Sequence, residues 1–169
     1  MLISEKWKTW RCTYDLKTCL SCRKMNGKIY AVSEMHNEKP FLHFFCRCVI
    51  TALEALQAGT ATIDGKSGAD WFLKRLGRLP PNYITETEAK TLGYNSKKGN
   101  LYIVAPGEML IRGVYKNKDG HLPEEFGRIW YEADINYISG YRGTCRVLYS
   151  NDGLVFVTYD HYETFVEIV

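Results

Sequence analysis

Residues 146–158 read Arg-Val-Leu-Tyr-Ser-Asn-Asp-Gly-Leu-Val-Phe-Val-Thr, and this stretch decides the fold class of the chain. β-Branched and aromatic residues lie on both sides of Asn151-Asp152-Gly153, a pattern typical of two antiparallel strands joined by a tight turn. Asn117-Lys118-Asp119-Gly120 supplies an earlier turn among residues of the same kind. From about residue 111 onward, the sequence therefore predicts a meander of antiparallel strands.

Two helices are predicted upstream of these strands. Residues 70–76 have amphipathic helical spacing, Gly77 lies just past their end, and Pro80-Pro81 prevents continuation. The second helix begins after Thr85, because Thr85-Glu86-Thr87-Glu88 has the form of a capping box, and Gly93 marks its end. Helices followed by a meander predict an α+β domain, with the helices packed on one face of an antiparallel sheet.

The chain is expected to have two parts. Residues 58–68 are small, polar and rich in glycine, which is typical of a linker. We therefore expect a cysteine-rich module at residues 1–57, a linker at 58–68 and the α+β domain at 69–169. The apolar residues within 47–58 recur near the helical period, so a short helix is predicted there.

Composition restricts the class of protein. Hydrophobic residues make up 46% of the 169 residues and charged residues 24%, which predicts a folded chain with a real core. The formal net charge of +3 is too small to identify a nucleic-acid-binding protein by itself. Residues 1–7 lack the apolar core of a signal peptide, and no run of about 18 apolar residues occurs. We expect no membrane partner, and the localisation stays open.

Five of the six cysteines lie between Cys12 and Cys48, which predicts a metal site. A Cys-x-x-Cys pair followed by a His-x-x-Cys-x-Cys group suits a structural, tetrahedral zinc site. The candidate ligands are Cys19, Cys22, His43, Cys46 and Cys48. We favour Cys19, Cys22 and Cys46, with either His43 or Cys48 as the fourth ligand. Disulfides or free thiols are the alternatives to a metal site. Cys12 and Cys145 have no neighbouring ligand and are expected to be incidental.

Metal-independent RNA cleavage needs a base for the ribose 2′-OH, an acid for the leaving 5′-oxygen, and cations around the phosphate. In the strand predicted over 128–134, Glu132 shares a polar face with Arg128 and Asp134. A carboxylate among cations stays ionised and can act as the base. His161 lies in the turn before the last strand, and histidine is the side chain best suited to act as the acid.

Five sequence segments together resemble the barnase group of guanyl-preferring microbial ribonucleases. These are Leu79-Pro80-Pro81-Asn82-Tyr83-Ile84-Thr85, Lys98-Gly99-Asn100-Leu101, Val104-Ala105-Pro106-Gly107, Trp130-Tyr131-Glu132-Ala133-Asp134-Ile135-Asn136-Tyr137 and Tyr159-Asp160-His161-Tyr162. The resemblance extends from about residue 60 to the C-terminal end. It implies a metal-independent endoribonuclease that cleaves single-stranded RNA after guanosine through a 2′,3′-cyclic phosphate.

The resemblance also assigns roles to single residues. It implies Glu132 as general base, His161 as general acid, and Arg142 and Arg146 as phosphate-binding catalytic residues. The substrate-binding residues that it implies are Tyr115, Asn117, Lys118, Asp119, Tyr162 and the residue at position 86. Asp119 stands where the family has a glutamate that pairs with the guanine edge.

Three positions depart from the family pattern. Glu86 replaces the family's active-site lysine, Lys118 replaces a loop arginine, and Gly113 replaces an aspartate. A carboxylate at position 86 would repel the phosphate, but it also suits a helix N-terminus, and Lys90 at the i+4 position can hold it aside.

Two functions follow from this sequence. The first is an active ribonuclease toxin that acts on RNA and is neutralised by a barstar-like inhibitor. The alternative is a catalytically weakened RNA-binding or structural phage module, because of Glu86. Residues 10–50 resemble the cysteine-rich tail of phage head-morphogenesis proteins, which implies a structural metal and a prophage or toxin-delivery setting.

Overall fold

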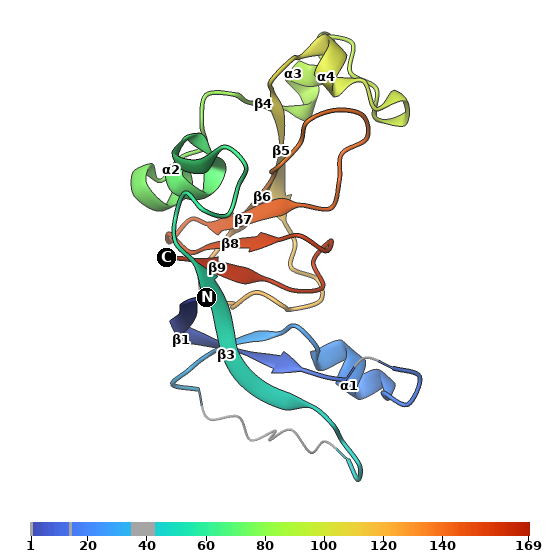
Figure 1. Cartoon of the computed structure of the whole chain (residues 1–169), viewed down its shortest axis with the longest axis vertical. Coiled ribbons are helices and arrows are strands. Elements are labelled where there is room, and N and C mark those ends of the chain that lie inside the picture. Colours follow the sequence, from blue (N-terminus) through green and yellow to red (C-terminus); the bar gives the residue numbers. More distant parts are fainter. Residues whose placement is uncertain (1, 14, 35–42) are drawn as a thin grey trace.

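The computed structural model describes residues 2–13, 15–34 and 43–169. Their strands form one nine-stranded sheet in the order β2-β1-β3-β9-β8-β7-β6-β5-β4 (Figure 1). The strands are β1 Leu2–Arg11, β2 Ile29–Ala31, β3 Val49–Leu56, β4 Tyr83–Thr85, β5 Met109–Tyr115, β6 Trp130–Asp134, β7 Arg146–Ser150, β8 Val155–Thr158 and β9 Val166–Ile168. The helices are α1 Leu20–Met25, α2 Ala69–Leu76, α3 Glu86–Thr91 and α4 Leu101–Val104, with 3₁₀ turns at Gly65–Ser67 and Ser96–Lys98.

The predicted α+β class is confirmed, but the sheet is mixed rather than antiparallel. Strands β5 to β9 form the predicted antiparallel meander, including the β7–β8 hairpin. Two pairs are parallel: β4 with β5, and β3 with β9. Parallel neighbours need a crossover connection, which α3 and α4 provide between β4 and β5.

The two predicted helices are present. Gly77 ends α2 in the left-handed conformation with φ 65°, and its N–H donates to Leu73 O. Thr85 caps α3 in the predicted capping box, in which Glu88 N donates to Thr85 Oγ1 and Thr85 N donates to a Glu88 carboxylate oxygen. Among the described residues, the helices are all too short or too polar to cross a bilayer.

The helix predicted over residues 47–58 is wrong, because Val49–Leu56 forms strand β3. This strand pairs with β1 on one side and β9 on the other. Short apolar runs do not distinguish a helix from a buried strand by spacing alone. The β-branched run Val49-Ile50-Thr51 and the available edge of β9 favour the strand.

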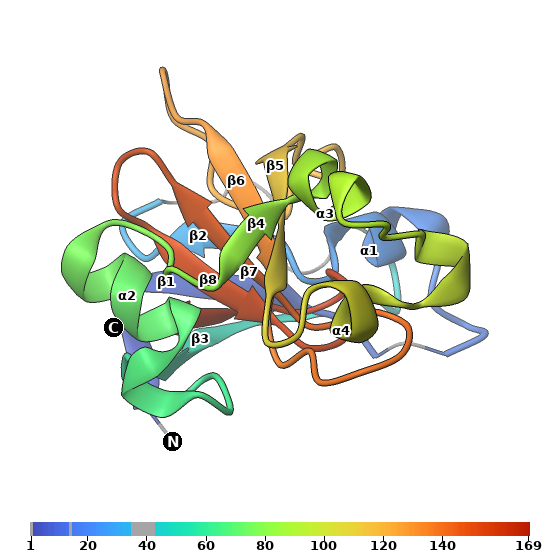
Figure 2. The same cartoon turned by 90° about the horizontal axis from the view of Figure 1, so that it is seen from above.

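The sheet separates two apolar clusters. On one face, Ala69 and Leu73 of α2 pack with Val147 and Val157. On the other face, Ile29 and Leu53 of the N-terminal part pack with residues of the meander, namely Leu122, Trp130, Leu148, Phe156 and Phe165. Helices α1 and α2 lie on opposite sides of the molecule in both views (Figures 1 and 2). The N-terminal part therefore shares its core with the meander.

Residues 58–68 pack against α2. The fully buried carboxylate of Asp70 accepts hydrogen bonds from Gly59 N, Ala61 N and Thr62 Oγ1 at 2.8–2.9 Å. These bonds fix the path of the segment between β3 and α2. The division into a module, a linker and a domain stays a prediction about how the chain folds.

Candidate active site

Glu132 projects from the middle of β6, on the face of the sheet opposite α2. Its side chain is 13% exposed. The Tyr162 hydroxyl donates to Glu132 Oε1 at 2.7 Å, and Nε of Arg146 lies 3.5 Å from the same oxygen. Nε of Arg112 follows at 3.9 Å. This carboxylate is therefore surrounded by one hydroxyl and two guanidinium groups.

A second carboxylate fixes the arginines beneath this site. Asp134 is 1% exposed, and its two oxygens lie 3.1 Å from Nε of Arg146 and 3.1 Å from Nη1 of Arg142. Burial raises the pKa of Asp134 above its usual value, although both arginines oppose that shift. Arg146 also donates to the carbonyl oxygens of Gly143 and Cys145, so its guanidinium is held from several sides.

His161 is exposed in the loop between β8 and β9, as predicted. His161 and Tyr162 both adopt the left-handed conformation, with φ 61° and 73°. The Asp160 carboxylate supports this backbone by accepting three hydrogen bonds, from Thr158 Oγ1, Thr164 N and Thr164 Oγ1. Such conformations are uncommon for residues other than glycine and cluster at functional sites.

Most of the predicted site residues meet in one cavity of about 660 Å³. The lining residues are Arg112, Val114, Tyr115, Lys116, Asn117, Lys118, Asp119, His121, Glu132, His161, Tyr162 and Glu163. Tyr115 and Tyr162 stack with ring centroids 5.4 Å apart. The cavity thus joins the predicted acid and base to residues 115–119, which the resemblance implies as the loop that binds guanine and which we call the base-reading loop.

Within that loop, Asn117 has a structural role. It is buried with φ 42°, its Nδ2 donates to Leu122 O, and its Oδ1 accepts from Leu122 N. These bonds close the loop and leave Lys118 and Asp119 exposed. A ligand in the cavity therefore meets the ammonium and the carboxylate of the loop.

Glu86 lies between two cations and is not among the residues that line the cavity. Lys90 Nζ lies 2.9 Å from Oε1, as predicted from the i+4 spacing, and Arg112 Nη1 lies 3.0 Å from Oε2. The hydrogen bond from Lys90, aided by the charge of Arg112, lowers the pKa of Glu86. The carboxylate thus stays ionised and paired.

Arg112 is a site residue that sequence reasoning missed. Its guanidinium bridges Glu86 and Glu132 and lines the cavity. A signal for Arg112 was present in the sequence. This cation stands next to Gly113, the position at which the family's aspartate is lost, and the family's lysine is replaced by the carboxylate of Glu86.

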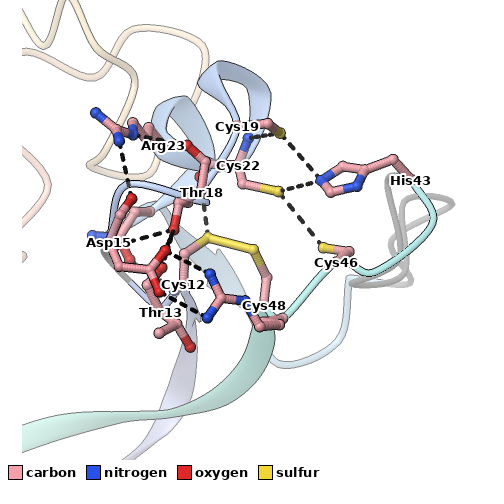
Figure 3. The surroundings of a disulfide bond; sticks show 12 residues. Cys12, Thr13, Asp15, Thr18, Cys19, Cys22, Arg23, His43, Cys46 and Cys48 are labelled. Carbon is pink, nitrogen blue, oxygen red and sulfur yellow. Dashed lines mark hydrogen bonds and ion pairs between the residues drawn. A yellow bond between two sulfur atoms is a disulfide. The ribbon is translucent and has the colours of Figure 1, made fainter.

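The predicted metal ligands gather beside α1 (Figure 3). His43 Nε2 lies 3.1 Å from Cys19 Sγ and 3.2 Å from Cys22 Sγ, and Cys46 Sγ lies 3.6 Å from Cys22 Sγ. Cys48 instead forms a disulfide with Cys12. This pairing corrects two expectations: Cys12 has a partner, and Cys48 is not available as a thiolate ligand.

The fold and the cavity define the class of protein: an α+β protein in which a carboxylate and a histidine line one cavity, with arginines beside the carboxylate. A family model described as ribonuclease matches residues 73–169. A ribonuclease of Heyndrickxia coagulans is 48% identical over 108 residues, which cover 64% of this chain and 99% of the relative. Ribonucleases of Bacillus intermedius and Bacillus pumilus are also 48% identical over 108 residues, or 67% of their length. The chain belongs to the microbial ribonuclease family.

Every residue that lines the cavity lies within the matched range, residues 73–169. The cysteine cluster, formed by Cys19, Cys22, His43 and Cys46, lies outside that range. The predicted resemblance to the barnase group is thereby confirmed, and the chain is a ribonuclease with RNA as its substrate. The N-terminal part is an addition to the matched region.

Proposed function

We propose that this ribonuclease cleaves single-stranded RNA on the 3′ side of guanosine. The observation that carries the proposal is that Glu132 and His161 line the same cavity as the base-reading loop with Lys118 and Asp119. A nucleotide in this cavity would place its base at the loop and its 3′-phosphate between the acid and the base.

The reaction has two steps. Glu132 takes the proton of the ribose 2′-OH, the 2′-oxygen forms a bond to phosphorus, and the bond from phosphorus to the 5′-oxygen breaks. His161 gives its proton to that leaving oxygen, which leaves a 2′,3′-cyclic phosphate. Water then attacks the cyclic phosphate with the two roles exchanged. The Tyr162 hydroxyl orients Glu132 through its 2.7 Å hydrogen bond.

Three arginines would stabilise the charge that builds on the phosphate. Arg146 is the best fixed, because Glu132 and Asp134 both contact its Nε. Arg142 is tied to Asp134, and Arg112 lines the cavity itself. Planar guanidinium groups bind phosphate oxygens through paired hydrogen bonds, which favours these residues for the role.

The alternative function, a weakened RNA-binding or structural module, depends on Glu86 repelling the phosphate. The ion pairs of Glu86 with Lys90 and Arg112 argue against strong repulsion. We propose that Arg112 supplies the cation that the family's lysine would supply, and that Glu86 positions it. By the resemblance, the family has its lysine in α3 and an aspartate in β5, whereas this chain has a carboxylate in α3 and a cation in β5, which we call the exchanged charge pair.

An oligoribonucleotide with a single guanosine tests the proposed function. In the presence of EDTA, the wild-type chain should cut it once, after the guanosine, and His161→Gln should remove this activity. The same oligonucleotide with adenosine at that position is the matched substrate control. Equal cutting at adenosine, or full activity of His161→Gln in a folded protein, would reject the assignment.

We also propose that the cysteine cluster holds a structural zinc ion through Cys19, Cys22, His43 and Cys46. Three sulfurs and one imidazole are a common zinc set, with bonds of about 2.0–2.3 Å that place tetrahedral ligands roughly 3.5–3.8 Å apart. The ligand atoms of Cys19, Cys22 and His43 all lie within 4.8 Å of one another, with His43 Nε2 at 3.1 and 3.2 Å from the two sulfurs. Cys46 lies outside this group of three, but its Sγ is 3.6 Å from Cys22 Sγ, so it is the fourth ligand that we propose. The ion would join the loop at His43 to α1.

Native mass spectrometry tests this site. The purified chain should carry one zinc ion, and Cys19→Ser/Cys22→Ser should carry none. Cys145→Ser is the matched control, since this cysteine lies far along the chain in the ribonuclease region. A wild-type chain that remains metal-free after refolding with zinc would refute the site.

The toxin setting and the barstar-like inhibitor are further proposals. The exposed cationic side chains at the cavity, Lys116 and Lys118, suit an acidic partner that would cover the site. Expression of the wild-type chain inside a bacterium should arrest growth, and His161→Gln should relieve the arrest. Unimpaired growth with active enzyme would exclude toxicity.

A further inference from the structure

A second cavity of about 440 Å³ adjoins the active-site cavity. It is lined by Arg23, Lys24, Lys28, Lys118, Asp119 and His121. The last three of these residues also line the active-site cavity, so the two cavities meet at the base-reading loop. The first three come from the N-terminal part, which lies outside the match to the family.

The charge of this second cavity favours an anion. It has four cationic side chains against the single carboxylate of Asp119, a net of +3 that equals the formal net charge of the whole chain. Burial lowers the pKa of His121, so this side chain is neutral at pH 7. Lys24 lies in the last turn of α1, where the helix dipole favours a cation, but Lys28 and Lys118 lie outside any helix.

The N-terminal cations are held in place against the ribonuclease region. Ile29 N donates to His121 O at 2.8 Å, next to Lys28. A side chain at Gly27, where φ is 83°, would collide with the carbonyl oxygen of Glu163. His121 Nδ1 contacts Tyr162 O at 3.1 Å, and its ring packs against Phe165. The cations thus belong to a fixed surface.

We propose that the second cavity is a subsite for RNA on the 5′ side of the guanosine, with Lys24 and Lys28 as phosphate-binding residues. The proposal rests on the proposed function, which puts the 3′-phosphate of the guanosine between Glu132 and His161. The guanosine would lie with its base at the base-reading loop and its 3′-phosphate at Glu132 and His161. The nucleotides on the 5′ side of the guanosine would then extend from the loop away from that phosphate, toward the second cavity. The N-terminal part thereby lengthens the RNA-binding surface of the ribonuclease.

Cleavage of three substrates by two variants tests the subsite. The substrates are GpA, the 5′-extended ApGpA and the 3′-extended GpApA. The 5′ extension should raise kcat/KM of the wild-type chain roughly tenfold, as expected for one or two added phosphate contacts, and this gain should fall with salt. Lys24→Ala/Lys28→Ala should lose the gain and cleave GpA like the wild type.

Lys97→Ala/Lys98→Ala is the matched control, because it removes the same charge from an exposed turn whose lysines line neither cavity. It should retain the gain from the 5′ extension. Equal kcat/KM of the wild type on GpA and ApGpA, or an equal loss by Lys24→Ala/Lys28→Ala on all three substrates, would overturn the subsite.

Binding of 2′-deoxy oligonucleotides separates the subsite from the proposed function, because they lack the 2′-OH and cannot be cleaved. The wild type should bind d(ApGpA) roughly tenfold more tightly than d(GpA), and Lys24→Ala/Lys28→Ala should bind both alike. Failure to cleave GpA would reject the proposed function, whereas equal binding of both deoxy ligands by the wild type would reject the subsite.

Discussion

The two ends of the nine-stranded sheet are stabilised by different means. From β4 to β9, large apolar side chains such as Leu110, Leu148 and Phe156 are fully buried, and α2 covers one face. At the β2-β1-β3 end, Leu2 and Ile3 are more than half exposed. There, Trp10 packs among Cys22, Cys46 and Cys48 in a sulfur-rich cluster.

This difference separates the parts of the molecule by the chemistry to which each responds. The end from β4 to β9, which we call the catalytic end, is stabilised by apolar burial and by arginine–carboxylate contacts. A metal chelator does not weaken either of these interactions. The N-terminal end shares part of the apolar core but has in addition the cysteine cluster around Trp10, and its Lys24 and Lys28 line the cavity that we propose as an RNA subsite. Removal of a proposed catalytic group should therefore lower cleavage with little change in stability, and removal of metal from the cysteine cluster should lower stability with little change in GpA cleavage. The following predictions test this separation.

The largest effect is expected at the catalytic end. Glu132→Gln removes the proposed base, so kcat on GpA should fall by about 10²- to 10⁴-fold, the usual contribution of a positioned base. The thermal unfolding temperature, measured beside the kinetics, should change little, because Asp134 still pairs with Arg146. Retention of wild-type kcat would assign the base to another residue.

Metal removal should act on the other end. If zinc is present at about 1,000 times its dissociation constant, its loss costs about 4 kcal/mol of unfolding free energy, which lowers the melting temperature by roughly 10 °C. Calorimetry with and without a chelator measures this shift. Cleavage of GpA below the new transition should stay within about twofold, since distant sites act independently. Loss of GpA cleavage on chelation would show that catalysis depends on the metal, and would contradict the separation of the two ends.

Arg112 should have an intermediate effect. Arg112→Met removes a cation from the proposed phosphate site and leaves Glu86 paired only with Lys90, so kcat/KM on GpA should fall about 10- to 100-fold. Adding Glu86→Gln to that variant should restore part of the loss. Arg75→Met, on the exposed side of α2, is the matched control. A loss that Glu86→Gln deepens would contradict the exchanged charge pair.

The smallest effect is expected at the cap of α3. Thr85→Ala removes the hydroxyl that accepts from Glu88 N, at a cost of about 1 kcal/mol in unfolding free energy. Urea denaturation measures this change. Thr87→Ala, at an exposed position of the same helix, should be close to neutral. Equal effects of the two substitutions would show that the capping box does not stabilise the domain.

The sequence predicted the parts of the fold that local signals specify. The capping box at Thr85, the stop at Gly77 and the turn at Asn151-Asp152-Gly153 each depend on a few neighbouring residues, and all three are present. Strand β3 depends on partners that are distant in sequence, β1 and β9. Spacing within residues 47–58 contains no information about those partners, so the helix prediction was wrong.

The candidate site divides in the same way. Glu132, His161 and the base-reading loop were named from sequence, and the structure brings them into one cavity, while their roles stay proposals. Arg112 and Lys28 were missed, because only the fold brings them to residues that are distant in sequence. Arg112 pairs with Glu86, and Lys28 lines a cavity together with Lys118. The disulfide of Cys12 with Cys48 was missed for the same reason, since sequence order does not determine cysteine pairing.

The phosphorus NMR spectrum of a GpA digest tests the central claim most directly. In the presence of EDTA, the wild-type chain should first produce guanosine 2′,3′-cyclic phosphate and then convert it to the 3′-phosphate, and His161→Gln should produce neither. A 5′-phosphate product, or a reaction that stops when EDTA is added, would contradict acid–base cleavage by Glu132 and His161.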